Sequence, residues 1–197
     1  MTDKTVEYYN ENAQNFFETT VNADMSLQLN DFIKLLPTEG YVLDAGCGSG
    51  RDSLALIKKG FKVDAFDASE EMCKRASELL GQQVRLCRFE ELDYSDQFDG
   101  IWACASLLHV TMEVMPDVIR RLYKALKEDG VLYASFKKGD GERYRGERRF
   151  TDADGTYLQS ILKDRFDIIV IRESIDVRPD RENEIWMNVF ARKIQSL

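Results

Sequence analysis

A glycine-rich turn between an apolar run and a helical segment constrains the fold of this chain most. Residues 42–52 read VLDAGCGSGRD, and glycines that follow a strand let the backbone approach a ligand closely. The helix expected to follow points its free N–H groups at the same place. Gly46 and Gly48 fit the dinucleotide-binding pattern, but Arg51 stands where the third glycine belongs, and a P-loop ending is absent. We therefore expect a ligand without a pyrophosphate, the alternative being a tight turn that binds nothing.

An acidic residue lies where the next strand is expected to end. Asp67 follows the β-type run of residues 61–66 and stands about 20 residues beyond Gly46. A carboxylate at this position can accept hydrogen bonds from both hydroxyls of a ribose. The alternative is an acid that only favours the start of the following helix. The glycine-rich turn and Asp67 together predict a nucleoside ligand.

Apolar runs alternate with helical segments along most of the chain. Strands are expected at residues 41–45, 61–66, 84–88, 98–103, 131–136, 166–175 and 184–194. Helices are expected at residues 6–17, 29–36, 52–59, 70–80, 116–126 and 154–162. The alternation predicts an α/β fold with a doubly wound, Rossmann-like, seven-stranded and mostly parallel sheet. The final two β-rich runs, separated by polar residues, predict an antiparallel pair at one edge of that sheet.

Size, charge and composition exclude several classes of protein. The chain has 197 residues, of which 44% are hydrophobic and 31% charged, so we expect a single globular domain over residues 1–197. The net charge of −8 disfavours binding to nucleic acid or to anionic membranes. No apolar run approaches the roughly 20 residues that a membrane span needs. The polar N-terminal segment does not predict a signal peptide.

The cysteines and the single histidine predict a chain without a metal site. Four cysteines occur with no C-x-x-C pair among them, which excludes a Cys/His zinc site by spacing. Thiols that stay free fit the reducing cytoplasm, where we expect this protein to work.

Two motifs carry a resemblance to a known family. The sequences DAGCGSG at residues 44–50 and FDASEEM at residues 66–72 resemble the class I S-adenosylmethionine-dependent methyltransferases, over roughly residues 42–138. Residues 98–110 and 126–139 are similar to the small stand-alone bacterial members, some grouped with tellurite-resistance methyltransferases. The resemblance implies S-adenosylmethionine as cofactor and a reversed last strand. It further implies that residues 1–38 form a helical lid over a cofactor-binding core of residues 39–197.

The resemblance also implies a set of cofactor contacts. These are Tyr9, Asp44, Gly46, Cys47, Gly48, Asp67, Ala68, Phe89, Glu90, Cys104 and Ala105. Asp44 is expected under the amino-acid end of the cofactor, Asp67 at the ribose, and Ala68 at the adenine. Phe89 stands near where the family often has an acid for the adenine amino group, so Phe89 is expected to stack on the base. Glu90 or its backbone N–H is then expected at the base edge.

The only histidine follows the fourth expected strand. The resemblance places His109 near the transferred methyl group, as a general base or a hydrogen-bond partner of the acceptor. The alternative is a histidine that holds loop backbone in place. Ser106 nearby sits in no G-x-S-x-G elbow, which disfavours a hydrolase.

A basic segment follows the fifth expected strand of this acidic chain. Residues 137–149 contain six basic and three acidic residues, and we interpret the segment as a loop at the carboxyl edge of the sheet, where ligands bind in such folds. Lys137, Arg145 and Arg148, with Arg51 from the first helix of the core, are expected to bind a carboxylate or oxyanion of the acceptor. The alternative is a solvated charged loop.

These observations favour a methyltransferase that acts on a small, anionic acceptor. One alternative is an RNA or protein methyltransferase with the same core, although no additional binding domain or Asn/Asp-Pro-Pro-Tyr/Phe motif is present. Another is a module that binds S-adenosylmethionine without catalysis. The acceptor and the oligomeric state do not follow from the sequence.

Overall fold

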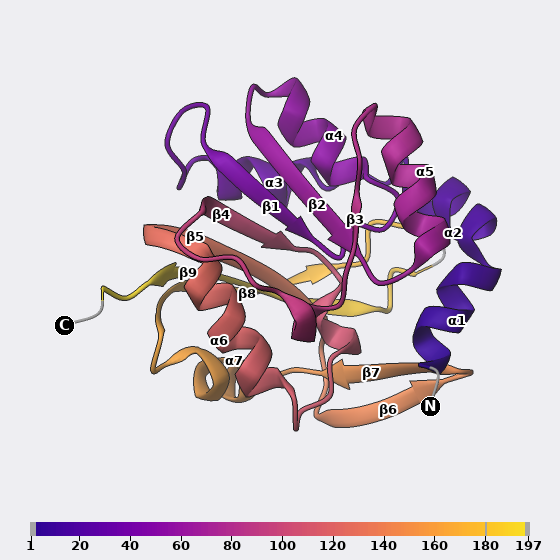
Figure 1. The fold of residues 1–197 in the computed structure, drawn as a ribbon. Coiled ribbons are helices and arrows are strands. Elements are labelled where there is room, and N and C mark those ends of the chain that lie inside the picture. Colours follow the sequence, from indigo (N-terminus) through magenta and orange to yellow (C-terminus); the bar gives the residue numbers. More distant parts are fainter. Residues whose placement is uncertain (1–2, 180, 196–197) are drawn as a thin grey trace.

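The computed structural model describes residues 3–179 and 181–195 and contains a seven-stranded mixed sheet (Figure 1). The strand order is β3-β2-β1-β4-β5-β9-β8. The strands are β1 (Tyr41–Ala45), β2 (Lys62–Asp67), β3 (Arg85–Leu86), β4 (Phe98–Ala103), β5 (Leu126–Lys137), β8 (Phe166–Ile175) and β9 (Ile185–Lys193). Only β9 runs antiparallel to its neighbours β5 and β8. The predicted fold class, with its reversed last strand, is therefore confirmed.

Helices cover both faces of the sheet. The α-helices are α1 (Lys4–Glu11), α2 (Ala13–Thr20), α3 (Ser26–Ile33), α4 (Arg51–Lys58), α5 (Glu70–Leu80), α6 (Met115–Ala125) and α7 (Gly155–Leu162). Two short 3-10 helices, η1 (Phe89–Glu91) and η2 (Leu107–His109), lie in the connections after β3 and β4. In Figure 1, α4 and α5 lie above the sheet with α3 behind them, and α6 and α7 lie below it.

Strand alternation divides the core between the two faces. Trp102 and Tyr133 point toward α3, where their rings stack at 3.9 Å and Phe32 packs against both. Leu43, Ile101 and Leu132 point the other way, toward α6 and α7. Burial of each large apolar side chain contributes about 1.5–3 kcal/mol. The sheet that positions the glycine-rich turn is therefore packed on both sides.

The N-terminal segment forms two helices where one was expected. The apolar spacing of residues 6–17 continues across Asn12, but the chain bends there, and Asn12 both ends α1 and precedes α2. The backbone N–H and side-chain amide of Asn12 both donate to the carbonyl of Tyr8. Asp3 pairs with Arg88 at 2.9 Å, which ties the start of α1 to the core.

The basic segment after β5 is a β-hairpin, so its interpretation as a loop was wrong. Strands β6 (Gly141–Arg145) and β7 (Arg148–Asp152) pair in antiparallel register with Arg145 opposite Arg148. Gly146, with φ of 61°, supplies the left-handed residue of the two-residue turn. The hairpin escaped prediction because β6 is exposed and polar, without the apolar alternation of a half-buried strand.

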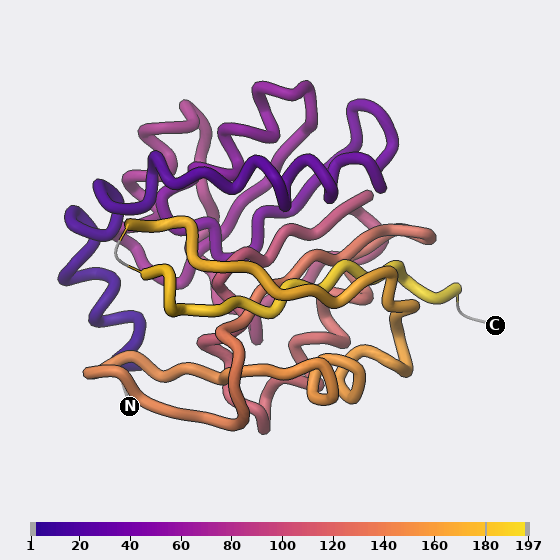
Figure 2. The backbone as a smooth tube through the Cα atoms, turned by 180° about the vertical axis from the view of Figure 1, so that it is seen from behind, coloured from indigo at the N-terminus to yellow at the C-terminus, as the bar shows by residue number. Residues whose placement is uncertain are grey.

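The hairpin, the N-terminal helices and the β8–β9 connection lie on the same side of the molecule. Figures 1 and 2 both show α1 beside the tip of the β6–β7 hairpin, and Figure 2 shows the connection between β8 and β9 beside α2. This side is the carboxyl edge of β1, β4 and β5, where the glycine-rich turn also lies. Two smaller differences concern strand length: β3 is shorter than residues 84–88, and β5 begins at Leu126.

Candidate functional site

The glycine-rich turn needs glycine for two physical reasons. Gly46 and Gly48 have φ angles of 75° and 53°, in the left-handed region that other residues rarely adopt. A Cβ atom added at Gly46 would lie 2.5 Å from Cβ of Ser106. The hydroxyl of Ser106 in turn donates to the carbonyl of Ala45 at 2.6 Å. The turn is therefore packed closely against the end of β4.

Asp67 faces this turn from the end of β2. Its two carboxylate oxygens accept hydrogen bonds from the backbone N–H groups of Gly48 and Ser69, both at 2.9 Å. Burial raises the pKa of Asp67, although these backbone donors oppose the shift. The structure thus links the two features that the sequence singled out.

Two adjoining cavities open beside the glycine-rich turn. The first, which we call the Asp67 cavity, holds about 800 Å³ of empty space and is bounded by α1, β2, η1 and η2. The second, which we call the arginine cavity, holds about 1150 Å³ and extends to the β6–β7 hairpin and the β8–β9 connection. Both volumes include space open to solvent. The residues that line both cavities are Tyr9, Phe16, Gly46, Gly48, Ala105 and His109.

Every predicted site residue lines one or both of these cavities. The Asp67 cavity alone has Asp67, Ala68, Phe89 and Glu90 in its wall. The arginine cavity alone has Asp44, Cys47, Arg51, Cys104, Lys137, Arg145 and Arg148. Tyr9, Gly46, Gly48, Ala105 and His109 stand where the cavities meet. The structure therefore brings the predicted residues together, while the role of each remains a prediction.

A buried acidic pair lies beneath the glycine-rich turn. Asp44 accepts a hydrogen bond from the Ser53 hydroxyl at 2.5 Å, and burial together with the neighbouring Asp52 raises its pKa. Arg51 forms two hydrogen bonds of 2.7 Å to the carboxylate of Asp52, which also accepts from Trp102 at 2.8 Å. Arg51 thus lies at the end of the arginine cavity next to the glycine-rich turn. The other expected acceptor contacts, Lys137, Arg145 and Arg148, follow much later in the sequence.

His109 is hydrogen-bonded through both ring nitrogens. Its Nδ1 lies 2.7 Å from the carbonyl oxygen of Arg149, and its Nε2 lies 2.8 Å from the hydroxyl of Tyr9. A carbonyl only accepts, so Nδ1 carries the proton and Nε2 accepts from Tyr9. Burial lowers the pKa of His109 to about 4. The imidazole is therefore neutral at pH 7.

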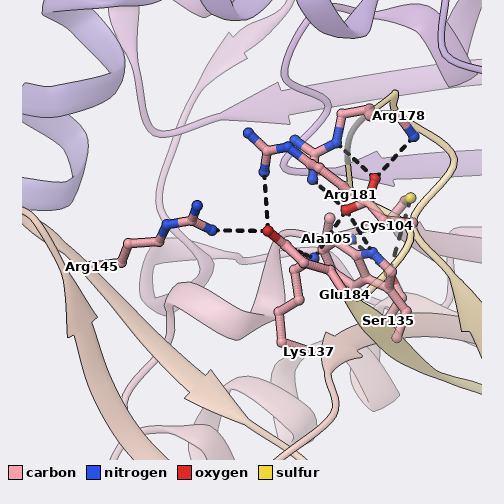
Figure 3. A network of polar contacts seen from close by, with 10 residues as sticks. Cys104, Ala105, Ser135, Lys137, Arg145, Arg178, Arg181 and Glu184 are labelled. Carbon is pink, nitrogen blue, oxygen red and sulfur yellow. Dashed lines mark hydrogen bonds and ion pairs between the residues drawn. The ribbon is translucent and has the colours of Figure 1, made fainter.

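A network of ion pairs forms the far wall of the arginine cavity (Figure 3). Lys137 at the end of β5 pairs with Asp176 at 3.0 Å and also with Glu184. Arg145 of the hairpin reaches Glu184 at 3.0 Å, and Arg178 reaches Asp176 at 2.6 Å. Burial opposes ionisation of Asp176, but the hydrogen bonds from Arg178 and Lys137 prevail and lower its pKa.

Arg148 differs from the other basic residues of this wall. Its guanidinium carbon lies 4.4 Å from the ring centre of Tyr8 and 5.4 Å from that of Phe150. Within residues 3–179 and 181–195, no carboxylate forms an ion pair with it. Cation–π contacts hold the side chain without neutralising its charge. Arg148 therefore brings an uncompensated positive charge to the cavity.

Comparisons with known proteins identify the family of this fold and site. A family profile described as a methyltransferase domain matches residues 42–130. An uncharacterized methyltransferase of Staphylococcus carnosus is 30% identical in an alignment of 137 residues that covers 66% of this chain and 66% of that protein. The chain belongs to the methyltransferase-domain family, and it has the fold of solved S-adenosylmethionine-dependent methyltransferases.

One further curated relative and one solved structure have names that state their substrates. The glycine/sarcosine N-methyltransferase of Aphanothece halophytica is 30% identical over 141 residues, covering 64% of this chain and 53% of that protein. The crystal structure of Burkholderia thailandensis 1,6-didemethyltoxoflavin-N1-methyltransferase, with its substrate and S-adenosylhomocysteine bound, superposes with a TM-score of 0.79 at 22% identity. That match covers 98% of this chain and 88% of the other. The sequence alignments span 66% of the Staphylococcus carnosus protein and 53% of the Aphanothece halophytica protein, so this chain matches only part of the curated relatives. The structural match establishes the fold alone.

The arginine cavity of the methyltransferase contains residues that sequence reasoning missed. Asp176, Arg178, Arg181, Glu184 and Trp186 all come from the end of β8, the β8–β9 connection and the start of β9. The sequence indicated only a hairpin turn there, and the one available signal was the density of alternating charge over residues 176–184. Their distance in sequence from the other site residues hid their role.

The described part of the chain has neither a metal-binding cluster nor a membrane-spanning helix. No group of three His, Cys, Asp or Glu residues in that part could hold a metal ion. No helix in it has the length and apolar character needed to cross a membrane.

Proposed function

We propose that this protein transfers a methyl group from S-adenosylmethionine to a small acceptor that carries a negative charge. The proposal rests on the charge of the arginine cavity, which adjoins the Asp67 cavity across a shared wall. Lys137, Arg143, Arg145, Arg148, Arg178 and Arg181 line its acceptor end, against the acids Asp176 and Glu184. This excess of positive charge stands in a chain whose net charge is −8, so it is a local feature that favours an anion.

The Asp67 cavity and the turn beside it fit the adenosine part of S-adenosylmethionine. Asp67 would hold the ribose hydroxyls, while Phe89, Ala68 and Glu90 in the same wall would meet the adenine. When bound, S-adenosylmethionine supplies a methyl group on a sulfonium, which is its own leaving group. Gly46 has no side chain and leaves the backbone accessible at the point where the two cavities join. Arg51 and Asp44 line the methionine end of the same path.

The N-terminal helices would exclude water from the reaction. Tyr9 of α1 and Phe16 of α2 line both cavities, and their rings meet edge to face at 5.0 Å. Polar contacts hold α1 closed, among them Thr5 to Arg149 at 3.1 Å and Asn10 to Ser69 at 2.6 Å. Contacts of this kind exchange readily with water. We therefore treat residues 1–38 as a lid that opens for exchange of ligands, on a core of residues 39–197.

This chain's residues catalyse the transfer mainly by position. The reacting atoms must lie in line and close together, which a fixed geometry achieves without activation of the methyl group. The cations of the arginine cavity would orient the acceptor by its negative charge. Arg148 would bind that charge, because it forms no ion pair with a carboxylate of the described residues. Four cysteines without a disulfide support our further proposal that the protein works in the cytoplasm.

Measurement of product formation with matched acceptors tests this function. Benzoates and the corresponding benzamides, each with a hydroxyl, amino or thiol substituent, differ in charge alone within each pair. We expect S-adenosylhomocysteine to form faster with the benzoates, and calorimetry to detect S-adenosylmethionine binding. Equal rates within each pair would contradict the anionic acceptor. A protein that binds no S-adenosylmethionine, or that methylates only short RNAs or peptides, would refute the proposal.

A further inference from the structure

Tyr9 and His109 form a hydrogen-bonded pair at the junction of the two cavities. Tyr9 comes from α1 and His109 from η2, a hundred residues later, and both line both cavities. The oxygen of Tyr9 lies 2.8 Å from Nε2 of His109. If methyl transfer takes place as proposed, the methyl group must cross this junction. The pair therefore stands beside the reacting atoms.

The hydrogen bonds of His109 determine the direction in which a proton can move. Because Nδ1 donates to the carbonyl of Arg149, the free electron pair of the ring lies on Nε2. That electron pair already accepts from the Tyr9 hydroxyl. A proton from the cavity therefore reaches His109 through the oxygen of Tyr9.

The surroundings keep both members of the pair uncharged at rest. Burial raises the pKa of Tyr9, and Asp67 and Tyr8 act in the same direction, while Arg148 opposes them. Burial lowers the pKa of His109 to about 4; Arg148 and Arg149 add to this, and Asp3 and the Arg149 carbonyl oppose it. The rings of Tyr8 and Phe16 contact that of Tyr9, and the ring of Phe150 contacts that of His109. A neutral phenol and a neutral imidazole can pass a proton along without prior ionisation.

Building on the proposed methyl transfer, we propose that Tyr9 and His109 are a proton relay for an anionic acceptor whose attacking atom is a hydroxyl oxygen or an amine nitrogen. The acceptor atom forms a bond to the methyl carbon, and the carbon–sulfur bond breaks with its electron pair left on sulfur. The acceptor's proton passes to the oxygen of Tyr9, and the phenol's own proton passes to Nε2 of His109. The products are the methylated acceptor, S-adenosylhomocysteine and an imidazolium, which loses its proton to water when the lid opens.

This assignment narrows the class of acceptor. A thiolate or a metalloid oxyanion attacks without losing a proton and gains nothing from a base. A hydroxyl or amine must lose one, and a base in the active site contributes typically about 100-fold or more in rate. Tyr9 is the catalytic residue in this scheme, since it faces the acceptor, and His109 acts through it.

Nuclear magnetic resonance tests the pair without any turnover, because the chain has one histidine. In uniformly ¹⁵N-labelled protein we expect the imidazole signal of one ring only. Its ¹⁵N shifts should show a ring that is protonated at Nδ1 and stays neutral down to about pH 5. The variant Tyr9→Phe should shift the Nε2 resonance and leave Nδ1 protonated. The matched control Tyr144→Phe, at a residue that is 69% exposed and lines neither cavity, should leave the signal unchanged. A ring protonated at Nε2, or an Nε2 signal that ignores Tyr9→Phe, would overturn the relay.

Turnover then separates a relay from a structural role. With a hydroxybenzoate or aminobenzoate we expect Tyr9→Phe and His109→Asn each to lower kcat about 100-fold, and the double variant to be no slower than either. The Kd for S-adenosylmethionine should change less than threefold, and a mercaptobenzoate should be methylated at the wild-type rate. Tyr144→Phe should match the wild type throughout.

The pH profile provides the deciding readout. For a hydroxybenzoate, kcat/KM of the wild type should be level above about pH 5 and fall below it, as His109 becomes protonated. In Tyr9→Phe it should rise tenfold per pH unit toward the acceptor's own pKa, because only the deprotonated acceptor reacts. Unchanged profiles in an active, cofactor-binding enzyme would overturn the relay alone. Absence of cofactor binding in the wild type would overturn the proposed function itself.

Discussion

The two cavities of this protein are built in different ways. The Asp67 cavity is held by backbone groups from neighbouring turns, such as the N–H groups of Gly48 and Ser69 on the carboxylate of Asp67. The wall of the arginine cavity is made of long side chains from β5, the β6–β7 hairpin and the β8–β9 connection. Backbone geometry suits one unchanging ligand, while side-chain ion pairs can be replaced one at a time. The proposed cofactor half (the Asp67 cavity) and the proposed acceptor half (the arginine cavity) can therefore change independently.

Replacement of Gly46 tests the part of the site that is built from backbone groups, and it has the largest expected effect on S-adenosylmethionine binding. Gly46→Val places a branched side chain where even a Cβ atom meets Ser106 at 2.5 Å, at a φ of 75°. We expect loss of detectable S-adenosylmethionine binding by calorimetry, with a strain of at least about 1–2 kcal/mol from the left-handed backbone. Gly60→Val, at φ of 89° with no atom within 4 Å, is the matched control and should still bind. Normal binding by Gly46→Val would contradict the close approach.

Removal of the buried charge of Asp176 tests how much the ion pairs of the arginine cavity contribute to the stability of the protein. The side chain of Asp176 is 2% exposed and that of Lys137 is 10% exposed, so Asp176→Asn leaves Lys137 and Arg178 with less compensation. We expect a loss of about 3 kcal/mol in the free energy of unfolding, measured with urea. Equal stability of variant and wild type at pH 7 would show that the network contributes nothing.

The same variant gives a defined pH dependence. The folded-state pKa of Asp176 is lowered below its usual value of 3.8, so its contribution is fully present above about pH 4 and is lost as the pH falls further. The difference between wild type and Asp176→Asn should therefore shrink below pH 4. A difference that grows on acidification would contradict the cause given for the shift.

Replacement of Asp67 tests the difference between the two cavities through the affinity for S-adenosylmethionine. Asp67→Asn removes a charge-assisted acceptor, worth about 2 kcal/mol, and should weaken S-adenosylmethionine binding about 30-fold. Binding of a benzoate in the arginine cavity should stay the same. Glu70→Gln, in the first turn of α5 and outside both cavities, tests the alternative that an acid near this helix start matters only electrostatically. Equal affinities of the two variants would support that alternative.

Replacement of Arg148 tests the arginine cavity through the KM for an acceptor, and it has the smallest expected effect of these variants. Arg148→Gln should raise KM for a benzoate about tenfold, equal to about 1.4 kcal/mol, and leave the Kd for S-adenosylmethionine unchanged. Lys138→Gln removes an exposed charge that pairs with Glu173 outside the cavities, and should behave as the wild type. A parallel rise in KM for the benzamide would mean that Arg148 acts through packing.

The sheet and the cofactor half were largely predictable from sequence because their signals are local. The strands expected at residues 98–103 and 166–175 have those bounds in the structure, since apolar runs and turn residues mark them directly. The helix expected at residues 70–80 likewise has those bounds in α5, with Ser69 and Gly81 as its capping residues. The geometry of a motif that lies within one strand, turn and helix is determined by residues that are neighbours in the sequence, so it can be predicted from the sequence.

The acceptor half was predictable only in part because long-range packing creates it. Arg145 and Arg148 could be selected from a basic segment, but Glu184, which compensates Arg145, lies 39 residues away. The charged segment that contains Glu184 does not reveal that partner. The bond between Tyr9 and His109 spans a hundred residues. The break at Asn12 was hidden for another reason, because the apolar spacing continues across it.

The placement of β9 has a consequence for how the protein is made. The ribosome produces residues 185–193 after β5 and β8, yet β9 is inserted between these two strands. Until then the nascent chain presents an apolar strand edge at β5, the kind of edge that pairs with other chains. Trp186 and Asn188 of β9 also complete the cavity wall. The wall of the arginine cavity is therefore complete only after residues 185–193 have been synthesised and inserted between β5 and β8.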